Sequence, residues 1–228
     1  MKPIRLNFDE SFIKKHLKSL DSPVRIKMKA DGFINCSILF LISPKKNKAY
    51  DLILIQRTKR PGDKHAGEMS FPGGIPDPKV DHSLEDTALR ETEEELGIRR
   101  DTISILGSFN DHLTPKKFII TPIVGYLKEP QEMKKEDKEV KEIVKVPIKF
   151  FANKANYRER TYKLHGETIA VGKFKYKLKG GKSYVIFGAT SHIIVDYLES
   201  VYNLNLMSDG CRRLKCGDLQ RRDRRLAL

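Results

Sequence analysis

Two apolar, β-branched runs early in the chain constrain its fold most. Residues 32–42 read GFINCSILFLI, and residues 49–57 read AYDLILIQR. The turn-rich polar insert SPKKNK separates them, so the pattern predicts two strands joined by a loop. Similar runs predict further strand or strand-and-turn segments at residues 102–109, 118–127, 139–151, 157–165 and 184–188.

Three segments show the apolar spacing of helices. Residues 9–20 are amphipathic, with Asp9 or Ser11 available as N-cap, and they space Phe12, His16 or Leu17, and Leu20 along one side. A second helix is predicted to begin after Ser83, with Asp86 three residues on, and to stop at Gly97. A closing helix over residues 190–202 is predicted to turn one apolar face inward, made of Ile193, Ile194, Tyr197, Leu198 and Val201. Strands and helices do not alternate regularly, so the fold class is α+β, with mixed strands and helices packed outside.

The length and composition predict one domain over residues 1–206. The chain has 228 residues, of which 39% are hydrophobic and 32% are charged, enough for one substantial core. Residues 207–228 use Arg where the rest prefers Lys and have little apolar periodicity, so they are predicted to be a basic, disordered tail. A nucleic-acid-binding tail is the alternative.

Charge and hydropathy bear on the expected location and partners of the protein but do not decide its function. No apolar run is long enough to cross a bilayer, and a soluble, cytoplasmic protein is expected. The net charge of +14 is compatible with polyanionic partners, but it is also what an ordinary Lys-rich surface gives. Of the three cysteines, Cys36 lies in an apolar run and is predicted to be a buried thiol.

An acidic cluster follows a Gly-Gly turn in this basic chain. On a helix, Glu91, Glu94 and Glu95 are spaced i, i+3 and i+4 and converge on one face, whereas Glu93 points away. Convergent carboxylates repel each other unless a hard cation such as Mg²⁺ or Mn²⁺ lies among them. A bare acidic surface is the simpler interpretation. The preceding SFPGG favours a site, because two glycines let the backbone approach the same place.

These residues resemble the Nudix box. Its second half is filled in order by Arg90, Glu91, Thr92, Glu94, Glu95, Gly97 and Ile98. The first half departs from the pattern, because the spacer between Gly74 and Arg90 is longer than usual and His82 stands where an upstream Glu is expected. The stretch ILIQRTKRPGDKHAGEMSFPGG also resembles the extra motif of coenzyme A pyrophosphatases. The resemblance implies a Nudix-like α/β/α sandwich with a mixed sheet and flanking helices.

The resemblance also implies roles for individual residues. The reaction would be metal-dependent hydrolysis of the diphosphate bridge of coenzyme A or its derivatives, giving 3′,5′-ADP and a 4′-phosphopantetheine product, with Mg²⁺ or Mn²⁺. The expected catalytic and metal-binding residues are Arg90, Glu91, Glu94, Glu95 and Gly74, the last through its carbonyl. Glu139 or Glu142 is the candidate for a base from a loop. The expected substrate-binding residues are Arg57, Lys59, Arg60, His65, Ser70 and Phe71.

Two other functions stay open from the sequence. The same chemistry could act on ADP-ribose, dinucleotides or other nucleoside diphosphate derivatives. The chain could instead be a non-catalytic nucleotide- or nucleic-acid-binding protein, although such a protein has no need of the three glutamates. A small-molecule nucleotide is therefore the expected partner, with nucleic acid disfavoured, no membrane, and a homodimer expected by family habit.

Overall fold

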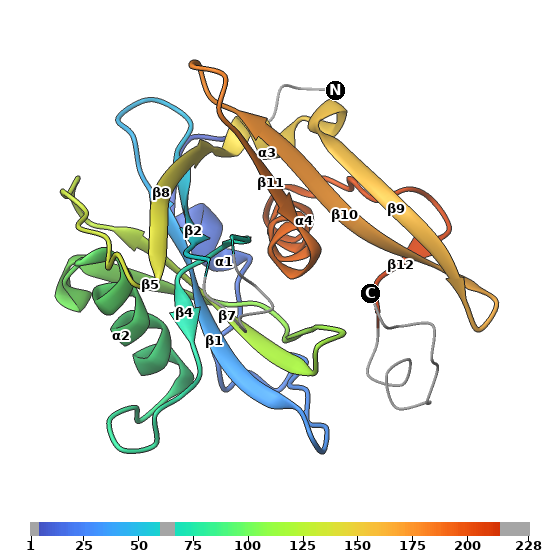
Figure 1. Cartoon of the computed structure of the whole chain (residues 1–228), viewed down its shortest axis with the longest axis horizontal. Coiled ribbons are helices and arrows are strands. Elements are labelled where there is room, and N and C mark those ends of the chain that lie inside the picture. Colours follow the sequence, from blue (N-terminus) through green and yellow to red (C-terminus); the bar gives the residue numbers. More distant parts are fainter. Residues whose placement is uncertain (1–4, 60–66, 215–228) are drawn as a thin grey trace.

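The computed structural model describes residues 5–59 and 67–214. Four α-helices and two sheets make up this part of the chain (Figure 1). The helices are α1 (Glu10–Lys15), α2 (Leu84–Leu96), α3 (Ile148–Ala152) and α4 (Gly188–Tyr202), with short 3-10 turns at Arg100–Thr102 and Lys154–Asn156. The strands are β1 (Ile34–Ser43), β2 (Asp51–Arg57), β3 (Met69–Ser70), β4 (Gly73–Gly74), β5 (Ile103–Ser108), β6 (His112–Leu113), β7 (Phe118–Leu127), β8 (Val140–Pro147), β9 (Tyr157–Leu164), β10 (Glu167–Lys177), β11 (Ser183–Phe187) and β12 (Cys211–Arg212).

The first sheet is mixed and has β1 at its centre. Its order is β3-β2-β1-β7-β5, with β4 paired to β1, β6 to β7 and β8 to β2. The β1–β7 pair is parallel, whereas β1 pairs with β2 and with β4 antiparallel. The two strands predicted from the apolar runs therefore lie next to each other at the centre of the sheet.

Helices cover both faces of this sheet, as the predicted fold class requires. Successive side chains of a strand point to opposite faces. Leu39 and Leu41 of β1 accordingly join the core cluster of α2, and Phe40 and Ile42 join the cluster of α4. The ring of Phe40 stacks on Tyr197 of α4 with centroids 4.5 Å apart. The α+β class with flanking helices is confirmed, as are all five inward residues of the closing helix.

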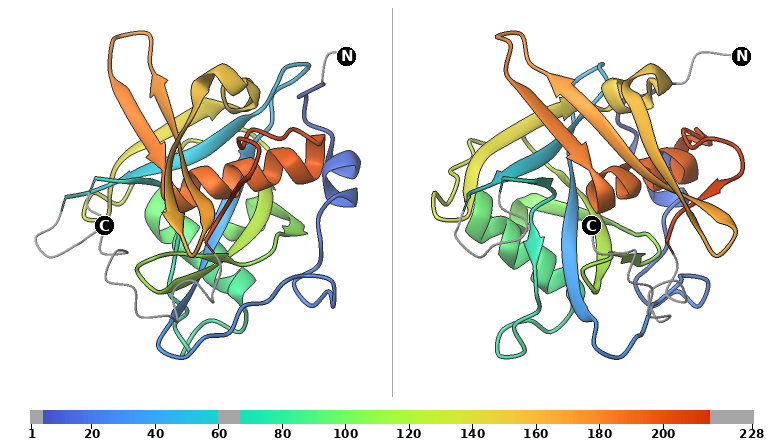
Figure 2. Two further views of the ribbon diagram at one scale, coloured as in Figure 1. Left: turned by 90° about the vertical axis from the view of Figure 1, so that its right-hand side faces the viewer. Right: turned by 45° about the vertical axis from the view of Figure 1, so that its right-hand side comes forward.

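The second sheet covers the other side of α4. It is built from β9, β10, β11 and β12, with β10 between β9 and β11 (Figures 1 and 2). Ser191 of α4 donates from its hydroxyl to the carbonyl of Gly172 in β10 at 2.6 Å. The long strand β10 is absent from the elements predicted from sequence, although Phe174 and Tyr176 alternate there with three lysines.

The ends of the first two helices follow local capping chemistry. Ser83 accepts from the Asp86 amide at 3.0 Å, and Gly97 ends α2 in the left-handed region with φ 65°, as predicted. Asp9 caps α1, but that helix ends at Lys15. The apolar side predicted for this segment is only partly buried: Leu17 and Leu20 pack against the core, whereas Phe12 is 41% exposed and Ile13 is the buried residue of the helix.

The predicted domain boundary at residue 206 is wrong for residues 207–214. Cys211 and Arg212 form β12, which pairs in parallel with Thr168 and Ile169 of β10. The next residue, Arg213, forms an ion pair with Asp196 of α4. Backbone pairing and an ion pair hold this segment in place. The prediction relied on apolar periodicity, and neither kind of contact produces such a pattern in the sequence. The rest of the predicted tail, residues 215–228, lies outside the described residues.

Truncation provides a direct test of this correction. A chain that ends at residue 206 is expected to unfold with a free energy about 2 kcal/mol lower than a chain that ends at residue 214, because Asp196 loses its partly buried partner. Urea denaturation of the two truncated chains measures the difference. Equal stability would show that residues 207–214 add nothing to the folded domain.

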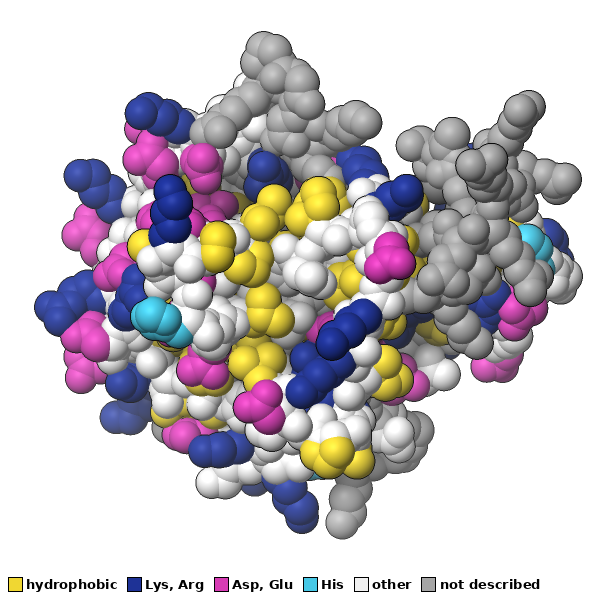
Figure 3. All heavy atoms as spheres, turned by 90° about the horizontal axis from the view of Figure 1, so that it is seen from below, with side chains coloured by type: hydrophobic (Ala, Val, Ile, Leu, Met, Phe, Trp, Pro, Cys, Tyr) yellow, Lys and Arg dark blue, Asp and Glu magenta, His cyan; other side chains and the backbone are white. Residues whose placement is uncertain are grey.

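Part of the surface mixes both signs of charge. Figure 3 shows one such face, where apolar side chains lie among interspersed Lys or Arg and Asp or Glu side chains. Within residues 5–59 and 67–214, no helix has both the length and the apolar character needed to cross a membrane.

Candidate active site

Two consecutive glycines face two glutamates where β4 runs beside α2. The amide of Gly73 donates to Oε2 of Glu95 at 3.1 Å. A Cβ placed on Gly74 would lie 2.4 Å from Cδ and from Oε1 of Glu91, so only glycine leaves room for this carboxylate. Gly73 itself has φ +146°, and a Cβ there would lie 2.3 Å from the Ser37 carbonyl oxygen. The Gly-Gly turn therefore approaches the carboxylates as its sequence predicted.

The two carboxylates lie in a partly dehydrated place. Glu95 is 2% exposed, and burial raises its pKa to about 8. The nearby charge of Glu91 acts in the same direction, while the Gly73 amide and Arg57 oppose it. Burial also raises the pKa of Glu91, against the lowering effect of Arg90. Two neighbouring carboxylates in such a place are fully ionised together only when further positive charge is present.

Arg90 holds one of these carboxylates in position and is itself held by Asp81. The guanidinium donates from Nε and Nη2 to the two oxygens of Asp81 at 2.8 and 2.9 Å. Its Nη1 lies 2.9 Å from Oε1 of Glu91. The Asp81 side chain is 3% exposed, and the hydrogen bonds from Arg90 hold its pKa well below the ordinary value. Asp81 was not among the residues predicted from sequence, where His82 stands at the position expected for an upstream Glu.

The third predicted glutamate takes a different position. Glu94 accepts from Arg90 Nη1 at 2.9 Å, and its side chain is 58% exposed. It therefore lies at the surface end of the cluster, with Glu91 and Glu95 deeper inside. Glu93 points away from them and pairs with Arg100 at 3.0 Å, as the helical spacing predicts.

The two candidate loop bases differ in their surroundings. Glu139 is exposed just before β8, and its charge raises the pKa of both Glu91 and Glu95, which places it near the pair. Glu142 accepts from the Tyr184 hydroxyl at 2.7 Å and forms an ion pair with Lys182. Burial raises the pKa of Glu142, but these two hydrogen bonds outweigh it and leave the pKa lowered. Glu139 is the better placed of the two.

The predicted substrate-binding residues are divided between site and core. Arg57 ends β2 close enough for its charge to lower the pKa of Glu95. The exposed Lys59 runs beside Gly67, where an added Cβ would lie 3.3 Å from Lys59 Cε. Ser70 ends β3, and its hydroxyl oxygen is buried without a hydrogen-bond partner among the described residues. Phe71 is 3% exposed, with its ring 4.7 Å from Phe40, so it is a core residue and not a surface for substrate.

Two of the predicted substrate-binding residues cannot be placed. Arg60 and His65 lie outside the described residues.

The carboxylate pair fits a hard divalent cation. Residues 5–59 and 67–214 contain no group of three or more His, Cys, Asp or Glu side chains arranged to hold a metal. Mg²⁺ does not require such a group, because one or two carboxylates commonly bind it, with waters and substrate phosphates completing the shell. Glu91 and Glu95 supply two carboxylates, and the absence of a side chain on Gly74 gives the Glu91 carboxylate room to lie there.

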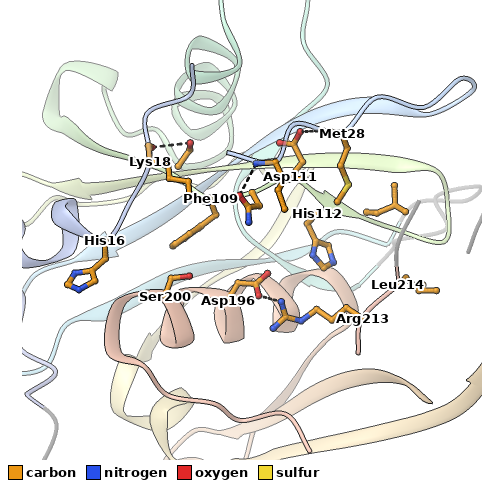
Figure 4. A pocket seen from close by; sticks show the side chains of 14 residues that line it. His16, Lys18, Met28, Phe109, Asp111, His112, Asp196, Ser200, Arg213 and Leu214 are labelled. Carbon is orange, nitrogen blue, oxygen red and sulfur yellow. Dashed lines mark hydrogen bonds and ion pairs between the residues drawn. The ribbon is translucent and has the colours of Figure 1, made fainter. Parts of the chain in front are cut away.

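A cavity of about 240 Å³ lies elsewhere, between residues 108–113, α4 and residues 213–214. Its two carboxylates are already engaged: Asp196 pairs with Arg213, as Figure 4 shows, and Asp111 pairs with Arg25 at 2.6 Å. His112 lies above Arg213, and burial together with that positive charge lowers its pKa to about 3. None of the predicted site residues lines this cavity, so it is separate from the candidate active site.

Comparison with known proteins assigns the family. The family model of the NUDIX domain matches residues 36–165, more than half of the chain. The chain belongs to the Nudix family. The matched range contains the Gly73–Gly74 turn, α2 and Glu139, so the carboxylate pair lies inside the Nudix domain.

Named relatives agree with this assignment. The chain is 29% identical over 160 residues to the peroxisomal coenzyme A diphosphatase NUDT7 of Mus musculus, a match that covers 70% of this chain and 66% of the mouse protein. It is 31% identical over 149 residues to a Nudix hydrolase, NudL, of Photorhabdus laumondii, with 65% of this chain and 76% of the relative covered. The crystal structure of a MutT/nudix family protein from Enterococcus faecalis aligns with a TM-score of 0.48 at 18% identity, over 78% of this chain and 66% of that chain.

The Nudix assignment carries a chemical class with it. The chain is a Nudix-type pyrophosphohydrolase, and enzymes of this family act on small-molecule nucleotide substrates and generally need divalent metal ions. The matches span about two thirds of the mouse relative but about half of a plant relative, Nudix hydrolase 22 of Arabidopsis thaliana.

Proposed function

We propose that the chain hydrolyses the diphosphate bridge of coenzyme A or its derivatives, with Mg²⁺ or Mn²⁺ as the metal. The observation that carries this proposal is the pairing of Gly73 and Gly74 with Glu95 and Glu91, beside Arg57. The named mouse relative, a coenzyme A diphosphatase, supports the choice of substrate. The products would be 3′,5′-ADP and a 4′-phosphopantetheine derivative.

Each protein group has a defined task in this reaction. Glu91 and Glu95 would hold the cation, Arg90 fixes the orientation of Glu91, and Asp81 fixes Arg90. The cation, when bound, supplies charge neutralisation to the diphosphate oxygens. Glu139 is the group available to take a proton from the attacking water. The Gly73 amide fixes one oxygen of Glu95 so that this carboxylate keeps its direction.

The bond changes follow from this arrangement. Water attacks one phosphorus of the bridge and a new P–O bond forms, while the bond from that phosphorus to the bridging oxygen breaks. The bridging oxygen leaves as part of the second phosphate monoester, and the proton of the water passes to the base. Positioning and charge stabilisation, which this site provides, account for most of the catalysis in such transfers.

The cations that follow β2 are proposed to bind the 3′-phosphate of coenzyme A. Arg57 ends β2 close enough for its charge to act on the Glu95 carboxylate, and Lys59 follows two residues later, beside Gly67. A guanidinium or ammonium group there can donate charge-assisted hydrogen bonds to a phosphate.

Substrate comparison tests this proposal. Wild-type enzyme is expected to hydrolyse coenzyme A with a kcat/KM roughly ten- to a hundredfold above that for dephospho-coenzyme A, because one charge-assisted hydrogen bond contributes about 1.5–3 kcal/mol. Arg57→Ala or Lys59→Ala should remove this preference. The matched control is Lys46→Ala in the exposed loop between β1 and β2.

Equal hydrolysis of the two compounds, or a preference for ADP-ribose over both, would overturn the coenzyme A assignment. The general Nudix pyrophosphohydrolase chemistry would then stand with another nucleoside diphosphate derivative as substrate. Cytoplasmic location and homodimerisation stay predictions.

A further inference from the structure

The second sheet has an outer face whose charge differs from that of the face in Figure 3. In β9, β10 and β11, Tyr157, Phe174 and Ile186 are paired side by side, and all three are buried in the core that contains α4. Residues adjacent to these along each strand must point to the opposite side. The register thus defines an outer face, which is buried beside β12, at Leu164 and Ile169, and exposed at the end of the sheet where β11 lies.

Cations occupy this outer face in register. Arg158, Lys173 and Phe187 form one row across the three strands, because Lys173 pairs with both of the others. Lys175 pairs with Val185 in the next row. The face is completed at its two ends by two more exposed cations, Arg160 and Lys177.

These five cations have no acidic partner among the described residues, and Arg158 donates to the carbonyls of Ala155 and Tyr157. Among the residues that the structure describes, none of the five takes part in an ion pair. The strands β9, β10 and β11 hold only two carboxylates. Glu159 pairs with Gly172, so its side chain points to the face opposite the cations. Glu167 lies at the β9–β10 hairpin and forms an ion pair with Arg212. The mixed charge of the face in Figure 3 is therefore absent here.

Apolar side chains stand among the cations. Phe187 is 43% exposed and Val185 is 46% exposed, although both belong to a strand that could have placed polar residues outward. The cations along β10 extend over about 14 Å, and three strands span about 10 Å. An exposed aromatic ring between positive charges on a flat sheet is suited to a base stacked on the ring and phosphates bound at its sides.

We propose that the outer face of β9, β10 and β11 binds single-stranded nucleic acid, with Phe187 as the stacking platform and the five cations as phosphate contacts. The face belongs to the second sheet, whereas Glu91 and Glu95 lie against the first, so this binding does not depend on the hydrolytic function. A duplex keeps its bases stacked and offers no free base to Phe187. An anionic membrane requires a larger inserted apolar surface than two side chains provide.

Binding of a labelled oligouridylate of about 15 nucleotides, followed by fluorescence anisotropy on the full chain, tests the proposal. Lys173→Glu with Lys175→Glu should weaken binding at least about tenfold and reduce the slope of log K against log salt by about 1.4, at 0.7 per phosphate contact. The matched control is Lys14→Glu with Lys15→Glu on α1, which makes the same charge change at exposed residues of another element. Residues 215–228 are present in every protein compared, so their own charge does not enter the differences.

Phe187→Ala separates stacking from general attraction to polyanions. It should weaken oligouridylate binding roughly five- to a hundredfold, as loss of one stacked base does, and leave heparin binding unchanged. Unchanged oligouridylate affinity in Phe187→Ala, or in the β10 double variant, would overturn the proposal. Tighter binding to phosphatidylserine vesicles than to the oligonucleotide would assign the face to a lipid surface instead. Circular dichroism and coenzyme A hydrolysis, measured on each variant, exclude misfolding as the cause.

Discussion

Glu95→Gln and Glu91→Gln are each expected to lower kcat at least about a thousandfold while the protein stays folded. Each substitution keeps the shape of the side chain but removes a negative charge from the proposed cation site. Loss of a group that only supports a metal ligand already costs about ten- to a hundredfold, so loss of a ligand should cost more. Glu95 is 2% exposed, and glutamine can still accept from the Gly73 amide. Turnover measured over a Mg²⁺ and Mn²⁺ titration, together with thermal unfolding, checks both parts.

Glu93→Gln is the matched control for this experiment. It makes the same chemical change on the same helix, at a residue that pairs with Arg100 and points away from the site. Its turnover should stay within about twofold of wild type, since an exposed ion pair contributes little. Wild-type turnover in Glu91→Gln or Glu95→Gln would show that the carboxylate pair does not hold the catalytic cation.

Gly74→Ala is expected to lower turnover more than about a hundredfold, through displacement of a single carboxylate. The added methyl group would lie 2.4 Å from Cδ of Glu91, so the side chain has to leave its place beside Arg90. A misplacement of about 1 Å near reacting groups can cost about a hundredfold. Steady-state kinetics measures the loss.

Gly180→Ala provides the comparison for an added methyl group. Gly180 lies in the turn between β10 and β11 with nothing within 4 Å of the added Cβ, so its activity should match wild type. Glu91→Asp combined with Gly74→Ala shortens the displaced side chain and should recover part of the lost rate. If Gly74→Ala alone is as active as wild type, the close approach of β4 to α2 has no catalytic role.

Much of the carboxylate site could be predicted because its residues lie close together in the sequence, on one helix. Residues three and four apart on a helix share a face whatever the rest of the chain does, so the placement of Glu91 and Glu95 on one face followed from spacing. Ser83 and Gly97, which bound α2, were predictable for the same reason. Helix ends and helix faces depend on a few residues close together in the chain, so the sequence alone is enough to predict them.

Contacts between distant segments were harder to predict. Asp81, in the loop before α2, binds Arg90, and the apolar periodicity of the sequence does not indicate such a contact. Phe71 belongs to a motif that resembles a substrate-binding one, yet its neighbour Phe40, brought by β1, makes it a core residue. Residues 207–214 were misjudged in the same way, since their partners lie on β10 and α4.

Because Asp81 contacts Arg90 from the loop before α2, the length of that loop does not determine where the side chains of α2 lie. The Gly73 amide binds Glu95, and Arg90 lies on α2 itself. The loop of residues 75–83 contacts the guanidinium through the Asp81 carboxylate and the Ile75 carbonyl. The loop can thus gain or lose residues without moving Glu91 or Glu95. A motif search with a fixed spacer length would pass over chains built in this way. A search that allows a variable gap, and asks for an aspartate or glutamate within about ten residues before the Arg-Glu pair, would find them.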